Sequence, residues 1–201
     1  MTVTELITNL SNTSLVGQDI ADLTKPTNVT TLTTLVNMAK DKVAEDTLLW
    51  LGGETITLAT GIYAYTLSII PVQIIDVYDE NRILRPRNSP DTMGYFQTTP
   101  NTLKFNSIVN GQDVYVNYYE APSDYIATDT IVVPATLLSA MQFYVAHKAF
   151  ELYKAESDIL MSKEYYAKYM AAINDFMKNS DSTSSDTIIS SENKLYKRGL
   201  M

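Results

Sequence analysis

Apolar residues recur at helical spacing close to the N-terminus of the chain. The pattern predicts a short helix behind a cap at Thr2 or Thr4, with one apolar face made by Val3, Leu6, Ile7 and Leu10. A largely polar segment, residues 11–27, follows and is expected to be a loop. The chain is therefore expected to open with a small amphipathic helix that packs on a larger core.

A second helical pattern predicts a helix over residues 28–51, capped by Thr27 or Asn28. Its apolar residues share one face: Val29, Leu32, Leu35, Val36, Ala39 and Val43. The pair Gly52-Gly53 is expected to end this helix, and Trp50 is expected to anchor the core.

The pattern changes to short β-type runs in a strand block over residues 55–133, at Thr55–Leu58, Tyr63–Leu67, Gln73–Tyr78, Ile83–Leu84, Thr102–Phe105 and Val114–Tyr119. The turn residues Asn110-Gly111 separate the last two runs, which predicts that these two runs form an antiparallel hairpin. The segment Arg85–Pro100 is rich in proline and is expected to be the longest irregular stretch.

Residues 135–178 are expected to be helical, either as one helix or as two helices with a cap at Ser157-Asp158. The first part has two apolar faces, one with Leu138, Met141, Val145 and Leu152 and the other with Phe143, Ala146, Phe150 and Tyr153. The second part has two adjacent rows, one with Tyr166, Met170, Ile173 and Met177 and the other with Tyr165, Tyr169, Ala172 and Phe176. A helix with two apolar faces indicates a central core position or a contact between subunits.

Together these patterns predict an α+β fold, in which N- and C-terminal helices form a bundle and a small antiparallel β-sheet or sandwich is inserted between them. Residues 1–178 are expected to form a single domain, with helices over 28–51 and 135–178 and the strand block over 55–133. Residues 179–201 begin with a polar run and end in apolar and basic residues. This segment is predicted to be a flexible or partner-docking tail with its hinge at Asn179 and Ser180.

Composition narrows the classes of function. The net charge of −8 disfavours tight binding of nucleic acid, because contacts with phosphates require lysine and arginine. The chain contains no cysteine, which excludes disulfides and thiolate chemistry. Neither a secretory signal nor an apolar stretch long enough to span a membrane is expected.

Few residues are candidates for chemistry, and we expect no catalytic residue, cofactor or metal site. His147 is the only histidine, and its position within a predicted helix favours packing or hydrogen bonding inside the fold. Asp76, Asp79 and Glu80 lack the spacing of a calcium loop. Arg82, Arg85 and Arg87 form a basic cluster that either pairs with carboxylates of the same chain or contacts an acidic partner.

The overall pattern resembles a bacteriophage head-to-tail adaptor, also called a connector, tail tubular A or neck ring protein. The resemblance covers residues 27–178. It rests on a helix leading into Leu48-Leu49-Trp50-Leu51, a compact strand block, the sequence Tyr118-Tyr119-Glu120-Ala121-Pro122, and Val133-Pro134 opening a long helix rich in alanine, tyrosine and phenylalanine.

The resemblance implies a structural virion protein of the neck, made in the bacterial host cytoplasm, which forms a ring of twelve subunits beneath the portal. Helices would pack side by side in the ring, and the strand block would face the tail or the next neck ring. An acidic lumen would let DNA pass during ejection without specific binding. No membrane contact is implied.

Three groups of residues are assigned to these contacts. Phe143, Phe150 and Tyr153 are expected at the subunit interface, and Arg82, Arg85 and Arg87 are expected at the tail side or another partner. The residues expected to dock on the portal lie in the tail: Ile188, Ile189, Leu195, Tyr196, Lys197 and Arg198.

The alternative is a monomeric β-sandwich that binds carbohydrate or a receptor. Its stacking platform would be Tyr63, Tyr65, Tyr95 and Phe96. An enzyme acting on a nucleotide or nucleic acid is a third and weaker possibility, because the acidic charge and the missing motifs both argue against it.

Overall fold

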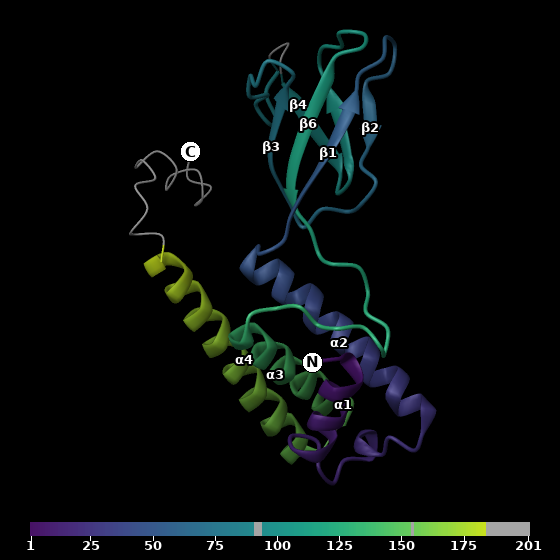
Figure 1. The fold of residues 1–201 in the computed structure, drawn as a ribbon, viewed down its shortest axis with the longest axis vertical. Coiled ribbons are helices and arrows are strands. Elements are labelled where there is room, and N and C mark those ends of the chain that lie inside the picture. The colour runs from purple at the N-terminus through teal and green to yellow at the C-terminus, as the bar shows by residue number, and fades with distance from the viewer. Residues whose placement is uncertain (91–93, 154, 184–201) are drawn as a thin grey trace. The chain divides into compact units, whose positions relative to one another are not determined.

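The fold is described from a computed structural model, which covers residues 1–90, 94–153 and 155–183 (Figure 1). It is α+β, as predicted. The elements in chain order are α1 (Val3–Asn12), the 3-10 helix η1 (Asp19–Ala21), α2 (Pro26–Thr47), β1 (Leu51–Thr57), β2 (Ala64–Thr66), β3 (Gln73–Asp79), β4 (Tyr95–Thr99), β5 (Thr102–Phe105), β6 (Asp113–Tyr119), α3 (Ala135–Glu151) and α4 (Glu156–Thr183).

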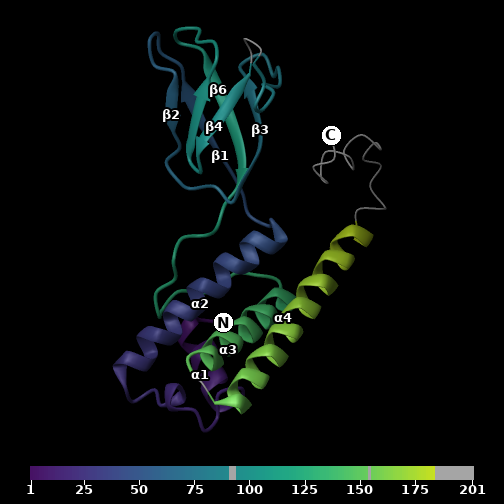
Figure 2. The ribbon, with the colours of Figure 1, turned by 180° about the vertical axis from the view of Figure 1, so that it is seen from behind.

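The chain divides into two compact units. The helical unit comprises Met1–Ala39 and Tyr125–Met201, and the strand unit comprises Lys40–Asp124. The reverse view in Figure 2 shows the same elements from behind.

Helix α1 is capped by Thr2, one of the two residues that the sequence offers as a cap. The Thr2 hydroxyl accepts a hydrogen bond from the Glu5 amide (3.2 Å), and the Glu5 carboxylate accepts one from the Thr2 amide (2.8 Å). These reciprocal bonds satisfy two amides that a helix N-terminus otherwise leaves unpaired. The predicted apolar face is confirmed, because Val3, Leu6, Ile7 and Leu10 are all buried.

Helix α2 starts at Pro26 and ends at Thr47, so the predicted end at residue 51 is wrong. Leu48 has φ of 49°, a left-handed conformation that stops the helix before the glycines are reached. Gly52 and Gly53 instead lie inside β1. Trp50 is only half-buried, so its predicted role as a core anchor is also wrong.

Helices α3 and α4 are separate, so of the two alternatives that the sequence leaves open, two helices apply. Because α4 begins at Glu156, Ser157 and Asp158 lie in its first turn and do not cap it from outside. At the other end α4 includes Asn179 and Ser180, where the sequence predicts a hinge. The predicted assignment of residues 179–201 as a tail stays a prediction.

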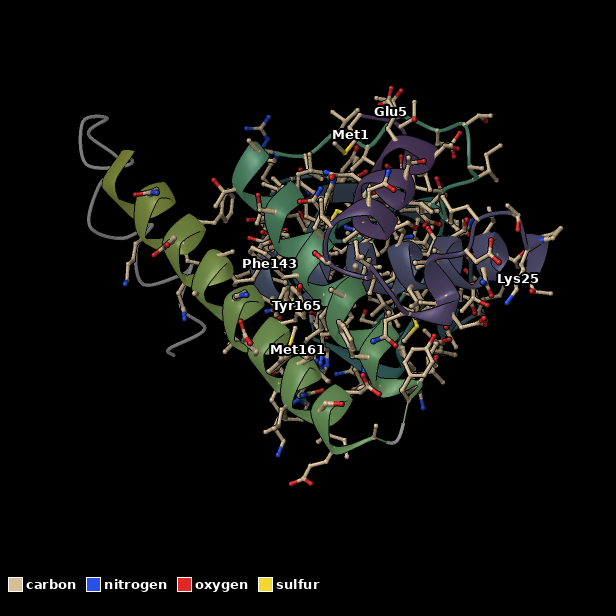
Figure 3. The ribbon with its side chains drawn as sticks, turned by 90° about the horizontal axis from the view of Figure 1, so that it is seen from below. Met1, Glu5, Lys25, Phe143, Met161 and Tyr165 are labelled. Atoms are coloured by element: carbon tan, nitrogen blue, oxygen red, sulfur yellow. The ribbon has the colours of Figure 1, made fainter. Side chains whose placement is uncertain are left out.

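Helix α3 occupies the centre of the helical unit, with α1 on one side and α4 on the other (Figure 3). Its buried residues are Leu137, Ala140, Met141, Tyr144, Val145, Ala146, Ala149 and Phe150. Of the two interpretations of its apolar faces, the core position therefore applies within this chain.

The strand unit contains two three-stranded antiparallel sheets, one in the order β1-β6-β3 and the other in the order β2-β5-β4. The predicted hairpin between β5 and β6 is wrong, because these strands belong to different sheets. Gly111 does make the expected turn, with φ of 79°, but the turn carries the chain from one sheet to the other. Strand β4 lies in a segment expected to be irregular, and the run Ile83–Leu84 contributes a single bridge between Leu84 and Tyr78.

The space between the two sheets is filled by aliphatic side chains and aromatic rings from both. Phe105 and Leu103 of β5 are fully buried, as are Val114 and Val116 of β6 and Val77 of β3. The Tyr65 and Tyr95 rings both pack against Phe105, at centroid distances of 5.9 and 6.3 Å. The strand unit is thus a small sandwich with its own core.

Two polar side chains of α2 bind the segment that follows β6. In the strand unit, the buried Lys40 ammonium donates to the Pro122 carbonyl and to Asp124 (2.8 Å), and lies 3.1 Å from Asp41. In the helical unit, Asn37 exchanges two hydrogen bonds with the backbone of Tyr125, of 3.1 and 2.8 Å. Both contacts hold the segment after β6 in place, where the backbone forms neither helix nor strand.

Candidate functional site

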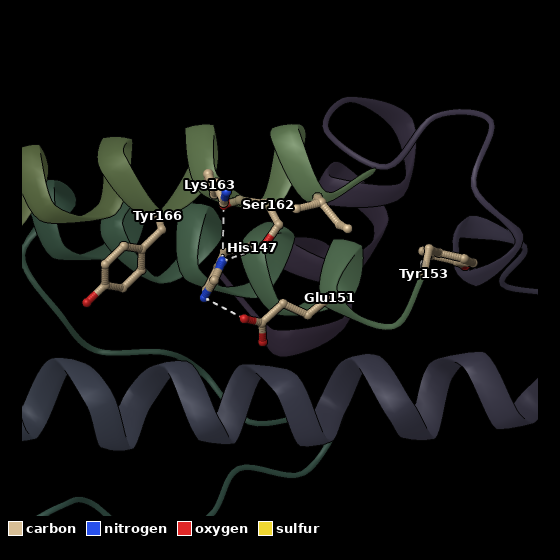
Figure 4. A pocket seen from close by; sticks show the side chains of 7 residues that line it. His147, Glu151, Tyr153, Ser162, Lys163 and Tyr166 are labelled. Carbon is tan, nitrogen blue, oxygen red and sulfur yellow. Dashed lines mark hydrogen bonds and ion pairs between the residues drawn. The ribbon is translucent and has the colours of Figure 1, made fainter. Parts of the chain in front are cut away.

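A groove of about 470 Å³ lies on the helical unit where α3 meets α4 (Figure 4). Helix α3 contributes His147 and Glu151, and the connection to α4 contributes Tyr153. The α4 residues are Ile159, Ser162, Lys163 and Tyr166. The helix break is what forms this groove, because it lets α4 fold back along α3.

His147 joins the two helices at the floor of the groove. Its Nδ1 lies 2.9 Å from the Ser162 hydroxyl and 3.1 Å from the Ser162 carbonyl, and its Nε2 lies 3.5 Å from Glu151. The rings of Tyr144 and Tyr166 pack beside it, at 5.6 and 5.0 Å. The imidazole side chain is 12% exposed, so its contacts lie within the fold, as predicted from the sequence.

Glu151 is held from a second side by Lys148. The Lys148 ammonium donates to Glu151 Oε2 at 2.7 Å. This hydrogen bond raises the pKa of Lys148 above its ordinary value, and partial burial opposes the shift. Because two neighbours already bind Glu151, its carboxylate is fixed in position along the edge of the groove.

The contacts from Ser162 to His147 and from His147 to Glu151 follow the order of a nucleophile, a base and an acid. The position of Ser162 does not suit nucleophilic catalysis. Ser162 is 5% exposed and lies within α4, where the backbone amides are used by the helix. An acyl-transfer site needs amides aimed at a developing oxyanion. The three side chains therefore act together as a link between α3 and α4.

A row of apolar side chains follows the groove along one flank of α4. Ile159, Tyr166, Met170 and Met177 are 46%, 39%, 37% and 41% exposed, and Lys163 lies among them. The spacing of i, i+4, i+7, i+11 and i+18 places these five residues on one stripe, called the α4 row below. The adjacent stripe, with Tyr165, Tyr169 and Ile173, is buried against α3.

The structure places the three residues predicted for the subunit interface close to α4. The Phe150 ring is 4% exposed and stacks on Tyr165 at 5.7 Å, and Phe143 is half-buried with its ring 6.5 Å from the same tyrosine. The Tyr153 hydroxyl accepts a hydrogen bond from the Ile20 amide at 3.0 Å. These side chains thus make contacts within one subunit, and their assignment to the interface stays a prediction.

The three arginines do not form one patch. Arg82 and Arg87 are exposed, and Arg87 donates to Gln97 at 2.7 Å. Arg85 is 2% exposed and donates to Gln112 at 2.8 Å, while its Nε and Nη1 have no hydrogen-bond partner among the described residues. Burial lowers the pKa of the Arg85 guanidinium, and the nearby negative charge of Asp79 opposes this shift. Of the three, only Arg82 and Arg87 present charge at the surface.

The predicted carbohydrate platform is not assembled. Tyr95 is 2% exposed in the core of the strand unit, whereas Tyr63 is 52% exposed. Tyr65 bonds the backbone of Ala59 through its hydroxyl. The four aromatic residues therefore do not form a single exposed surface.

Among the described residues, no group of three or more histidine, aspartate or glutamate side chains is arranged to hold a metal ion. Within the same part of the chain, no helix is long and apolar enough to cross a membrane. The residues predicted to dock on the portal, Ile188, Ile189, Leu195, Tyr196, Lys197 and Arg198, lie outside the described residues.

The sequence predicts Tyr166, Met170, Ile173 and Met177 as one row, and this prediction is wrong for Ile173, which is buried. Ile159 and Lys163, which complete the α4 row, were not predicted, and neither was the rest of the groove. Glu151 follows His147 by four residues on a predicted helix, so this pair was accessible from the spacing alone. Ser162 depends on how α4 folds back on α3, and the sequence carries no local signal for that contact.

An uncovered row of large apolar side chains such as the α4 row is typical of a subunit that assembles with other chains. The family model described as SU10 adaptor protein matches residues 1–190, and the chain belongs to this family. It is thus a bacteriophage adaptor, a structural virion protein that joins head and tail. The family implies interaction with portal and tail proteins. No curated protein matches the chain significantly.

Proposed function

We propose that this adaptor forms a ring, with twelve subunits, that joins the phage portal to the tail and gives DNA a passage between them. The observation that carries the proposal is the α4 row, in which four large apolar side chains are 37–46% exposed along one helix. A stripe of this kind on a subunit that must assemble is best explained as a contact between copies.

The charge of the chain supports the conduit. With a net charge of −8, the subunits carry an excess of carboxylates that repel a DNA backbone. Repulsion between the acidic lumen of the proposed ring and the phosphates keeps a DNA duplex from binding to the lumen as it moves. DNA therefore passes through the lumen without specific binding and without a dedicated site.

We propose that helices of neighbouring subunits pack side by side in the ring. Phe143 and Tyr153 are assigned to the lateral contact, with Phe150 behind them fixing the position of α4. The segment that includes Ile188, Ile189 and residues 195–198 docks on the portal. Arg82 and Arg87 face acidic groups of the tail or the next neck ring, and Arg85 supports their segment from within the strand unit.

Light scattering on the purified protein, alone and mixed with the portal of the same phage, tests the ring. We expect a species of about twelve subunit masses in at least one of the two conditions. A chain ending at Thr183 keeps all of α4 and is expected to lose portal binding while it retains the fold. A monomer that ignores the portal in every condition contradicts the proposed function.

A further inference from the structure

The first residues of the chain pair with the segment that leads into α3. The Val3 amide donates to the Asp129 carbonyl, the Thr4 amide to the Ala127 carbonyl, and the Ile131 amide to the Met1 carbonyl, each at 3.0 Å. Thr2 and Thr130 form an antiparallel bridge between the same two segments. Residues 1–4 and 126–132 thus make a short two-stranded element, called the N-terminal ribbon below.

The ribbon exposes apolar side chains with no cover inside the helical unit. Val132 is 78% exposed, Ile126 63% and Met1 44%. Two of the three are β-branched residues that pack well in a half-buried extended segment. This apolar surface is separate in sequence and in secondary structure from the α4 row.

The two surfaces lie on different sides of α3. Figure 3 shows α3 between α1 and α4, with Met1 and Glu5 at the α1 side. A ring of more than two subunits requires two different surfaces that complement each other, because a surface that binds its own copy closes as a dimer. The ribbon and the α4 row give the helical unit such a pair.

Both surfaces have charged side chains that make no ion pair among the described residues, and these unpaired charges are opposite in sign. Lys163, in the middle of the α4 row, makes no ion pair among the described residues. Glu5 and Asp129 lie on the ribbon side, where each carboxylate accepts a hydrogen bond from a backbone amide. Within the part of the chain that the structure describes, neither carboxylate has a cation within ion-pair distance. Opposite charges around an apolar contact favour one orientation of the two partners.

We infer that the α4 row and groove of one subunit receive the N-terminal ribbon of a second copy of this chain. The contact is head-to-tail, with Val132 and Ile126 packing against Tyr166 and Met170, and Lys163 facing Asp129. The inference rests on the proposed ring and adds the α4 row and the N-terminal ribbon to the lateral contact proposed above.

Two single variants test this arrangement by complementation. Tyr166→Glu places a carboxylate in the α4 row, where it opposes the acidic ribbon. Val132→Lys places an ammonium on the ribbon, where it opposes Lys163. Each variant alone is expected to associate with itself at least about tenfold more weakly, because a charge enters an apolar contact.

Mixing the two variants is expected to restore at least one contact. The Val132→Lys chain keeps an intact α4 row, and the Tyr166→Glu chain keeps an intact ribbon, so the pair forms at least a 1:1 heterodimer through these two surfaces. At the second contact the introduced ammonium faces the introduced carboxylate, and this attraction lets the heterodimer grow into larger mixed species. Native mass spectrometry reads out the heterodimer, and light scattering reads out the wild-type ring. The same mixture is measured with the portal if the wild type assembles only there.

Matched controls carry the same charges at other exposed positions. Leu160→Glu lies on α4, about 100° around the helix from Ile159, and Leu160 is 62% exposed. Val16→Lys lies in the loop at the opposite end of α1 from the ribbon, and Val16 is 64% exposed. Both controls are expected to assemble like the wild type. If circular dichroism shows that Tyr166→Glu or Val132→Lys is unfolded, Met170→Glu and Ile126→Lys replace them.

The outcomes separate the inference from the proposed function. Monomeric single variants and a heterodimer or larger mixed species in the mixture support the head-to-tail contact. A wild-type ring with single variants that still assemble, or with a mixture that stays monomeric, overturns the contact and leaves the ring intact. A wild type that never assembles, with or without portal, overturns both.

Discussion

Lys40 is the most deeply buried charged residue of the strand unit, and we expect its replacement by methionine to destabilise the protein. The side chain is 1% exposed and its ammonium binds the Pro122 carbonyl, Asp124 and Asp41. Methionine has a similar length and no charge. The substitution therefore removes the ammonium and its bonds while it keeps most of the packing.

The size of the effect follows from what is left behind. A hydrogen bond to a charged group contributes about 1.5–3 kcal/mol, and a buried carbonyl without a donor costs about 1–3 kcal/mol. The loss of stability is partly offset in the methionine variant, because the free-energy cost of burying the ammonium disappears. Asp41 and Asp124 are 56% and 76% exposed, so water solvates them once Lys40 is gone. We expect Lys40→Met to lower the free energy of unfolding by about 2 kcal/mol.

Urea denaturation followed by circular dichroism measures this change, which corresponds to about 4–8 °C in Tm for a chain of this size. Asp124→Asn is the control, because an exposed partner in an ion pair contributes less than about 1 kcal/mol. If Lys40→Met unfolds within about 0.5 kcal/mol of the wild type, the Pro122 carbonyl does not depend on Lys40 and the reasoning is refuted.

Three further predictions concern other parts of the molecule. Thr2→Ala removes the hydroxyl of the capping box and is expected to cost about 1 kcal/mol in thermal unfolding, whereas Thr2→Ser should be close to neutral. Gly52→Ala would place a methyl group 2.5 Å from the Tyr118 ring and should cost about 1–3 kcal/mol, whereas Gly53→Ala, with its nearest neighbour at 3.3 Å, should cost less. Burial raises the pKa of Tyr95 and of Tyr118, so both keep the neutral form in the fold. Their contribution to stability is complete below about pH 10 and is lost as the pH rises through their raised pKa values. Absorbance titration at 295 nm should show two late-ionising groups, one of which disappears in Tyr95→Phe, and a titration unchanged by that substitution would contradict the assignment.

The helices were predictable because their signals are local. The candidate caps Thr2 and Thr4 and the apolar period after them predict α1. The lack of glycine and proline after Pro134 likewise predicts α3 and α4. The end of α2 was missed because Leu48 adopts a left-handed backbone, which is uncommon for a residue other than glycine.

The sheets were less predictable because strand pairing is not local. The turn at Gly111 is compatible with a hairpin and equally with a crossing between sheets, and only the packing of Phe105 and Val114 in a shared core selects the crossing. Strand β4 was missed because it follows a segment rich in proline and contains few apolar residues. Its place depends on pairing with β5, which no nearby residue specifies.

The candidate site shows the same division. The apolar spacing on α4 predicts that Tyr166, Met170 and Met177 share a stripe, but it wrongly adds Ile173, which is buried. The packing of α4 on α3 decides which of the two adjacent stripes is buried. The structure shows that it is the stripe with Tyr165, Tyr169 and Ile173. The ribbon had no signal, because its pairing joins residues more than a hundred positions apart.

The contact between Lys40 and Asp124 has a consequence for how this family can vary. These two residues are the first and last of the strand unit, and their side chains meet at 2.8 Å. A segment whose two ends meet can be shortened, lengthened or exchanged while the rest of the chain stays closed, as in tolerated domain insertions. Changes in the length or sequence of the strand unit can therefore be confined to that unit, because each unit has its own buried core.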